Sequence, residues 1–333
     1  MIMLIPLMPF NWPNFVSTFF GKLGAALNGE ISVIPNIIFD MGLAPSGSKV
    51  VLEKPLTDRY ETFYYEYSNF FYLSGRKILL WGALIVMYPF IWYLKRNYAD
   101  KHKFCKLWEN IELKYRYTLI LRAMLLSYVS LLLASTLNIY RMQFVNIQCL
   151  VSCFVSIAFQ IGFIYLPILI MNILQRSYDR LSHPKFLGQY STIIAEMDLS
   201  HPSKYMFYAV FLMRRIIFVF MLVLFASSPT TGIGAHCGTA LLMILYVLIA
   251  KPFKRRITAV LTILGELFVI GFHLIGLGIL NPDQPDDENT QFGFIVVAML
   301  AVFLLIAFIC ILVQVISDIV TEWKARSQKS KDI

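Results

Sequence analysis

Three charged residues lie deep inside long apolar stretches of the chain, where a charge is costly and usually has a partner or a function. Arg214 and Arg215 occur in the stretch 206–227, and Glu266 occurs in the stretch 258–280. All three lie about 12–14 Å from the start of their stretch at 1.5 Å per helical residue. An arginine–glutamate pair at this depth lessens the desolvation cost of both groups. The sequence therefore predicts a buried charge network, which is either a structural clamp or part of a polar seam for an ion or substrate.

Geometry restricts how this network forms. Adjacent helical residues point about 100° apart, so Arg214 and Arg215 cannot face Glu266 equally. We expect one arginine to pair with Glu266, and the other to reach a carbonyl, a water-filled cavity or the membrane interface. Gln160 and His273 also lie within apolar stretches and are candidates to extend a polar path. A lone histidine on an apolar helix is, however, more often a packed residue than a site.

The elements that position these residues are membrane-spanning helices. Of the 333 residues 58% are hydrophobic and only 15% are charged, with a mean hydropathy of +0.66. Such a chain cannot cover a soluble domain with polar groups. The sequence predicts an all-α, polytopic membrane helix bundle of about seven transmembrane helices, with the end of an eighth at the N-terminus left open. The expected spans are 76–95, 117–139, 147–174, 206–227, 233–250, 258–280 and 292–316, and the third is expected to tilt or bend near Pro167.

The basic residues between the spans predict the orientation, because loops rich in Lys and Arg stay in the cytosol. They alternate strictly, with nineteen on one side of the membrane and one, Arg141, on the other. The nineteen are Lys95, Arg96, Lys101, Lys103, Lys106, Lys114, Arg116, Arg176, Arg180, Lys185, Lys204, Lys251, Lys254, Arg255, Arg256, Lys324, Arg326, Lys329 and Lys331. We therefore expect an outer or lumenal segment 1–75, a transmembrane bundle 76–319 and a basic cytosolic tail 320–333, in the plasma membrane or an endomembrane.

Two charged surface clusters carry further expectations. Lys251, Lys254, Arg255 and Arg256 form a short basic turn that suits anionic lipid headgroups, each basic residue near such lipid being worth about 1 kcal/mol. The same turn also serves simply to fix topology. An outer acidic loop contains Asp283, Asp286, Asp287 and Glu288. A cluster of one sign raises the local concentration of counter-ions, so this loop is a candidate to attract cations, although a solvated polar loop is the plainer interpretation.

Several function classes are disfavoured. The chain has no phosphate-binding Gly-rich loop, no His-Glu-x-x-His and no Gly-x-Ser-x-Gly motif. We therefore expect no enzyme, no cofactor and no metal site, and the scattered basic residues do not indicate nucleic-acid binding. Asp58-Arg59-Tyr60 spells a receptor tripeptide but precedes the first span, which argues against a G-protein-coupled receptor. Gly234-x-x-x-Gly238 is typical of close helix packing.

The stretch from Lys185 to Ile270 resembles the TRP-like (transient receptor potential-like) transmembrane domain of fungal and protist membrane proteins, especially the C-terminal region of large ciliate surface proteins. The resemblance rests on the segment from Lys204 to Phe218 with its double arginine, on Lys251-Pro-Phe253, and on the following helix with Glu266. It extends loosely over residues 75–320. It implies cation permeation, notably of calcium, and for some fungal relatives flavin transport. The large ectodomain of such proteins is not present in this chain, which suggests a fragment.

The leading functional prediction is a cation-permeating channel or channel-like module. The alternatives are a non-conducting multi-span anchor or receptor region of a large surface protein, and a small-molecule carrier. The lipid bilayer and its anionic headgroups are the expected partners, and a homo-oligomer is left open.

Overall fold

The computed structural model describes residues 69–98, 111–142, 147–181, 183–226, 228–278 and 286–329, together with Val16, Trp108 and Phe144. Side chains within this set are described except at a few helix positions, which include Asp286, Asp287 and Glu288. Asp283 and nearly all of the predicted outer segment 1–75 lie outside the described residues.

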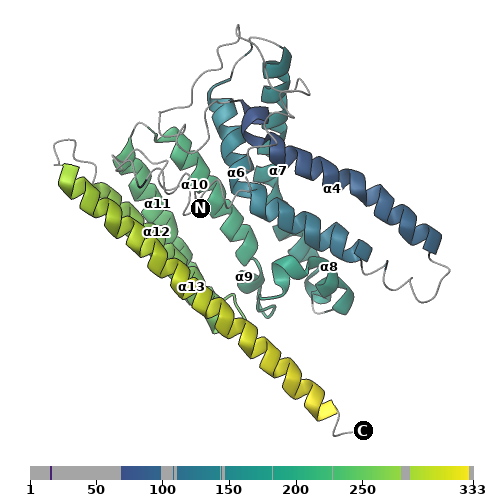
Figure 1. Cartoon of the computed structure of the whole chain (residues 1–333). Coiled ribbons are helices and arrows are strands. Elements are labelled where there is room, and N and C mark those ends of the chain that lie inside the picture. Colours follow the sequence, from purple (N-terminus) through teal and green to yellow (C-terminus); the bar gives the residue numbers. More distant parts are fainter. Residues whose placement is uncertain are drawn as a thin grey trace.

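The described residues form helices without a named β-strand, and 7 of the helices are long and apolar enough to cross a membrane. These are α4 (Phe70–Tyr98), α6 (Ile120–Tyr140), α7 (Ile147–Arg176), α10 (Phe207–Leu224), α11 (Pro229–Ala250), α12 (Arg256–Gly278) and α13 (Asp286–Lys329) (Figure 1). Each overlaps one of the predicted spans over most of its length, so the predicted all-α membrane bundle is confirmed. The chain is a multi-pass integral membrane protein.

Local sequence explains several helix ends. Pro229 starts α11 at a position where a missing N–H costs nothing. The same helix ends at Lys251, whose left-handed backbone (φ 48°) closes the last turn, and Pro252 follows. A short π-helix, η2 (Lys114–Leu119), leads into α6. Pro167 lies inside α7, which remains one helix across it.

Short segments join the helices on one side of the bundle, which we call the α8 side. Here α7 and α11 end, α10 and α12 begin, and the short helices α8 (Pro184–Ile194) and α9 (Pro202–Tyr205) lie between them (Figure 1). The opposite side is the far side. An isolated bridge between Met197 and Phe253 ties the loop after α8 to the α11–α12 turn. Backbone hydrogen bonds from Asp198 N to Pro252 O (2.8 Å) and from Lys254 N to Glu196 O (2.9 Å) strengthen this junction.

The long helices pack as two groups that share α10. In one group α6 packs against α7, α4 and α10; in the other α11 packs against α12 and α10, and α12 packs against α13. Leu212 and Val219 of α10 are fully buried between these neighbours. Gly271 marks the close approach of α12 to α13, because a Cβ built there would lie 2.9 Å from Met299 Cε.

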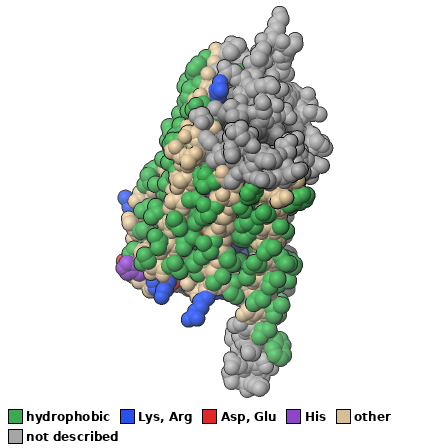
Figure 2. Space-filling view, turned by 90° about the vertical axis from the view of Figure 1, so that its left-hand side faces the viewer, with side chains coloured by type: hydrophobic (Ala, Val, Ile, Leu, Met, Phe, Trp, Pro, Cys, Tyr) green, Lys and Arg blue, Asp and Glu red, His purple; other side chains and the backbone are tan. Residues whose placement is uncertain are grey.

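Apolar side chains cover the outside of the bundle. Leu126, Val86 and Ile249 are 86%, 73% and 80% exposed, which in water would be unfavourable but in lipid is the expected state. Figure 2 shows one such face, largely hydrophobic, with most of the visible Lys, Arg and His side chains toward its lower edge.

Two features differ from the sequence-based expectation. A Cβ at Gly234 or Gly238 would meet no atom within 4 Å, so the Gly-x-x-x-Gly pair does not mark close packing within this chain. Gly234 is exposed on the surface of α11. In addition, α13 is a single helix that continues past residue 319 into the predicted tail.

Candidate functional site

The predicted pairing of one arginine with Glu266 is present. Arg214 Nη1 of α10 donates to Glu266 Oε1 of α12 at 2.6 Å, and Arg214 Nη2 contacts Glu266 Oε2. Both side chains are only 6% exposed. Two parallel contacts of this kind give a guanidinium–carboxylate pair directionality as well as strength. The pair therefore fixes α10 relative to α12 at one point inside the bundle.

Arg215 takes the second role that was expected for the other arginine. Its Nη1 donates to the backbone oxygen of Leu125 in α6 at 3.4 Å, and its guanidinium lies 4.1 Å from the centre of the Phe211 ring. A cation over an aromatic face is stabilised by the ring quadrupole, the more so when both are shielded from water. The adjacent arginines thus reach in different directions, one toward α12 and the other toward α6.

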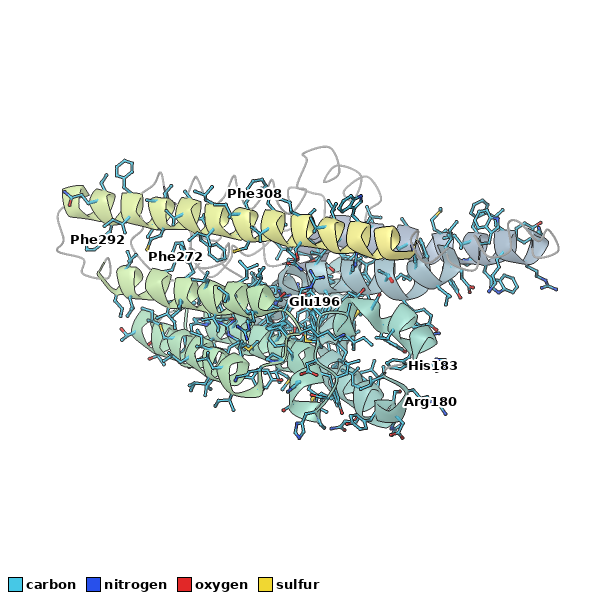
Figure 3. The ribbon with its side chains drawn as sticks, turned by 90° about the horizontal axis from the view of Figure 1, so that it is seen from below. Arg180, His183, Glu196, Phe272, Phe292 and Phe308 are labelled. Atoms are coloured by element: carbon cyan, nitrogen blue, oxygen red, sulfur yellow. The ribbon has the colours of Figure 1, made fainter. Side chains whose placement is uncertain are left out.

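A cavity of about 470 Å³ leads from the α8 side to the charge pair. Its walls come from one face of α10 and one face of α12, together with Glu196 and Phe253 of the loop junction. The lining residues are Glu196, Phe207, Tyr208, Phe211, Arg214, Arg215, Phe253, Thr258, Leu261, Thr262, Gly265, Glu266 and Val269. Seen from the α8 side, Glu196 lies near the middle of the molecule, whereas Arg180 and His183 lie at its edge (Figure 3).

Two histidines lie beyond the pair, toward the far side. His236 of α11 and His273 of α12 are 1% and 0% exposed, and their ring centres are 5.3 Å apart. His273 Nδ1 lies 2.5 Å from the backbone oxygen of Val269, a residue of the cavity wall. The other ring nitrogen of His273 and both of His236 have no hydrogen-bond partner among the described residues. Both rings interact electrostatically with Arg214.

These groups form one polar face along α12. Thr258, Thr262, Glu266 and His273 follow one another at intervals of four, four and seven residues, which places them within about 80° of one another around the helix. The face is about 22 Å long at 1.5 Å per residue. Val260, Leu267 and Leu274 on other sides of α12 are each at least 50% exposed. One helix therefore presents a polar face inward and an apolar face outward.

The chain matches no family model, no curated protein and no solved structure. The resemblance to the TRP-like domain stays a prediction, and function has to be inferred from the geometry of the helices.

Gln160 belongs to a different polar cluster. Its Oε1 accepts from Ser135 Oγ at 2.6 Å and from Thr136 Oγ1 at 3.3 Å, both on α6. Farther along the same helix pair, Ser156 Oγ donates to Asn138 Oδ1 at 2.6 Å. The α6–α7 cluster, defined as Ser135, Thr136, Asn138, Ser152, Ser156 and Gln160, is buried throughout. Its hydrogen bonds join neighbouring helices, as polar side chains commonly do inside membranes.

Of the two predicted surface sites, the structure describes the basic turn but not the side chains of the acidic loop. Lys251, Lys254, Arg255 and Arg256 lie together at the turn between α11 and α12 and are all exposed, so they are available to headgroups. Lys254 Nζ also donates to Ala195 O at 3.2 Å. Of the acidic loop, Asp283 is outside the described residues, and the side chains of Asp286, Asp287 and Glu288 are not described. Their role as a cation-attracting loop stays a prediction.

Sequence reasoning missed Thr258, Thr262 and His236. The two threonines were detectable as members of a polar face, because their spacing to Glu266 repeats the helical period. His236 was detectable as an ionisable residue within the span 233–250. Glu196 carried no signal, because only the long-range junction with Phe253 brings it to the cavity.

Proposed function

We propose that this protein is a channel-like membrane module that passes a cation along the inward face of α12. The observation that supports this most strongly is the polar face of Thr258, Thr262, Glu266 and His273, which covers most of the length of a membrane-spanning helix. Hydroxyl, carboxylate and imidazole groups lower the cost of moving an ion through hydrocarbon. A helix that only anchored the chain would not need them in register.

In this proposal the Arg214–Glu266 pair closes the path. The carboxylate is the group on the face that attracts a cation, and the guanidinium of Arg214 occupies it at two points. A cation passes only when it competes with Arg214 or when α10 moves away from α12.

The proposed orientation places the α8 side in the cytosol. The exposed basic turn from Lys251 to Arg256 then meets the anionic inner leaflet, and the cavity opens to the cytosol. The acidic residues around the start of α13 would concentrate cations at the far side.

Cation flux into vesicles tests the proposal. The purified full chain is reconstituted into vesicles of phosphatidylcholine and phosphatidylglycerol, and uptake of H⁺, K⁺ and Ca²⁺ is followed with dyes trapped inside. We expect flux of at least one cation above that of protein-free vesicles, and altered flux in Glu266→Gln. Flux equal to that of protein-free vesicles for all three cations would contradict the proposal and favour a non-conducting anchor.

A second candidate, a small-molecule carrier, is favoured by the cavity. Its volume of about 470 Å³ lies within the range of small-ligand sites, and its wall combines aromatic rings with two arginines. Such a wall suits an organic anion with an apolar body. The test is thermal stabilisation of the purified protein by aromatic carboxylates and phosphates, with Arg215→Gln as the variant expected to lose it.

A further inference from the structure

We infer that the cation conducted along α12 is the proton, and that His236 and His273 form its buried binding site. This inference rests on the proposed function and specifies its substrate. It begins from two imidazole rings that lie against each other in the far half of the bundle, each almost completely buried.

The described part of the path lacks a cluster of His, Cys, Asp or Glu side chains that could bind a metal cation. The carboxylate of Glu266 is engaged by Arg214 at two points. A dehydrated metal cation needs several ligands at once, whereas a proton needs one titratable atom at each step. The spacing of the polar groups along α12 therefore suits a proton better than a metal ion.

The hydrogen bonds of His273 leave one nitrogen free to accept a proton. With Nδ1 donating its hydrogen to Val269 O, the ring lone pair is on Nε2, and Nε2 has no partner among the described residues. Buried polar atoms without partners are rare in native proteins, and each requires an explanation. A proton carried to this nitrogen supplies one.

His236 can continue the transfer. Neither of its ring nitrogens has a partner among the described residues, so the ring can take a proton on one nitrogen and release it from the other. Phe218 of α10 packs against this ring at 4.6 Å between centres. His236 is seven residues from the first residue of α11, or about 10 Å, and so lies within reach of the far side.

The proton steps balance without another reactant. Hydronium in the cavity transfers a proton to Glu266, forming an O–H bond and leaving water. The neutral carboxyl group then binds the guanidinium of Arg214 more weakly. The proton passes through water over the next two turns of α12 to His273 Nε2, breaking the O–H bond and forming an N–H bond. The proton then passes from His273 Nε2 to a nitrogen of His236, breaking one N–H bond and forming another. His236 releases a proton from its other nitrogen to water on the far side, which leaves both rings neutral.

Few other charges face the two rings. The charged group that acts on both rings is Arg214 of α10, and Arg214 is in turn paired with Glu266 of α12. On α11 the neighbouring titratable residue is Cys237. The segment of α13 from Thr290 to Ser317 has no charged residue. A change in conduction with pH should therefore depend on the two histidines and on the Arg214–Glu266 pair.

The test uses vesicles that contain pyranine, a pH-sensitive dye, with proton entry driven by a K⁺ gradient and valinomycin. We expect the wild-type protein to carry protons, and His273→Gln and His236→Gln to lower the rate on the order of 100-fold, as is typical for loss of a positioned proton-transfer group. Glutamine preserves hydrogen bonding but does not titrate. His183→Gln, at an exposed site on the α8 side, is the matched control and should retain the wild-type rate. If a glutamine variant does not fold, the corresponding phenylalanine variant, His273→Phe or His236→Phe, is used instead, because phenylalanine preserves the packing of the ring.

Three other outcomes of this experiment would each overturn a different claim. Flux of K⁺ or Ca²⁺ in separate vesicles without valinomycin, together with no proton flux, overturns the inference and leaves the proposed function standing. Proton flux that is undiminished in both histidine variants overturns the assigned site. Flux of no cation overturns the proposed function and the inference together.

Discussion

Arg214 binds Glu266 through its two terminal guanidinium nitrogens, with Nη1 2.6 Å from Oε1, although the two residues are 52 positions apart in the chain. The contact joins α10 to α12 inside an apolar bundle. Because an unpaired charge at this depth is strongly unfavourable, the pair constrains the helices as well as the chemistry of the cavity.

Substitution of Arg214 should lower the free energy of unfolding more than substitution of Glu266. We expect Arg214→Leu to lower the free energy of unfolding by about 3–5 kcal/mol, because it leaves a buried carboxylate without its donors. Glu266→Gln should cost less, since the amide oxygen still accepts from Arg214 and the cavity lies beside it. Unfolding of the purified protein in detergent, followed by circular dichroism, measures both.

The double variant Arg214→Leu, Glu266→Leu is the control for this prediction. Apolar side chains of similar volume often replace a buried ion pair at little cost, so its stability should return close to that of the wild type. A double variant that is as unstable as Arg214→Leu would mean that the lost stability comes from packing and not from an unpaired charge.

Each hydrogen bond of the α6–α7 cluster should contribute only modestly to the stability of the protein. A double-mutant cycle with Asn138→Leu and Ser156→Ala isolates the 2.6 Å bond between these residues. We expect a coupling energy of about 0.6 kcal/mol, the average for hydrogen bonds between membrane helices. Leu126→Ala, at a lipid-exposed position of α6, is the matched control and should show no coupling to Ser156→Ala. A coupling of several kcal/mol would show that this cluster, and not hydrophobic packing, holds the two helices together.

The loop between α8 and α9 should contribute less to the stability of the protein in acid. Asp198 Oδ2 accepts from Lys204 Nζ at 2.7 Å, and this hydrogen bond, with another from Ser200 N, lowers the pKa of Asp198 from 3.8 to about 2. A lowered folded-state pKa stabilises the protein above the unfolded value and loses that contribution as the pH falls toward the folded value. The difference in Tm between the wild type and Asp198→Asn should therefore be constant above about pH 4 and shrink between pH 4 and 2.

The exposed Asp179 provides the comparison, because it lies on the same side of the bundle. The Tm difference between the wild type and Asp179→Asn should change less between pH 4 and 2 than the difference for Asp198→Asn. If the Tm difference for Asp198→Asn stays unchanged down to pH 2, the carboxylate does not stabilise the loop through Lys204.

The sequence was most informative where one physical requirement dominates. Hydrophobic length located all seven helices, and matched depth brought Arg214 to Glu266, because a buried charge has few alternatives to a partner of opposite sign. Lateral arrangement was not predictable in the same way. Gln160 turns toward α6, and Gly234 faces open space, since apolar helices can pack in lipid through several faces of similar energy. The bridge between Met197 and Phe253 joins distant loops and leaves no local pattern.

The central claim is that the face of α12 with Thr258, Thr262 and Glu266 lines a water-accessible path. Cysteine accessibility tests it most directly. With the five native cysteines replaced by serine or alanine, single cysteines are placed at Thr258, Thr262, Val260 and Leu267, and their reaction with a charged, membrane-impermeant thiosulfonate is timed in vesicles. The account predicts rapid modification at Thr258 and Thr262 from the α8 side, and little at Val260 and Leu267, which face lipid. Equal protection of all four positions, or faster reaction at Leu267 than at Thr262, would contradict it.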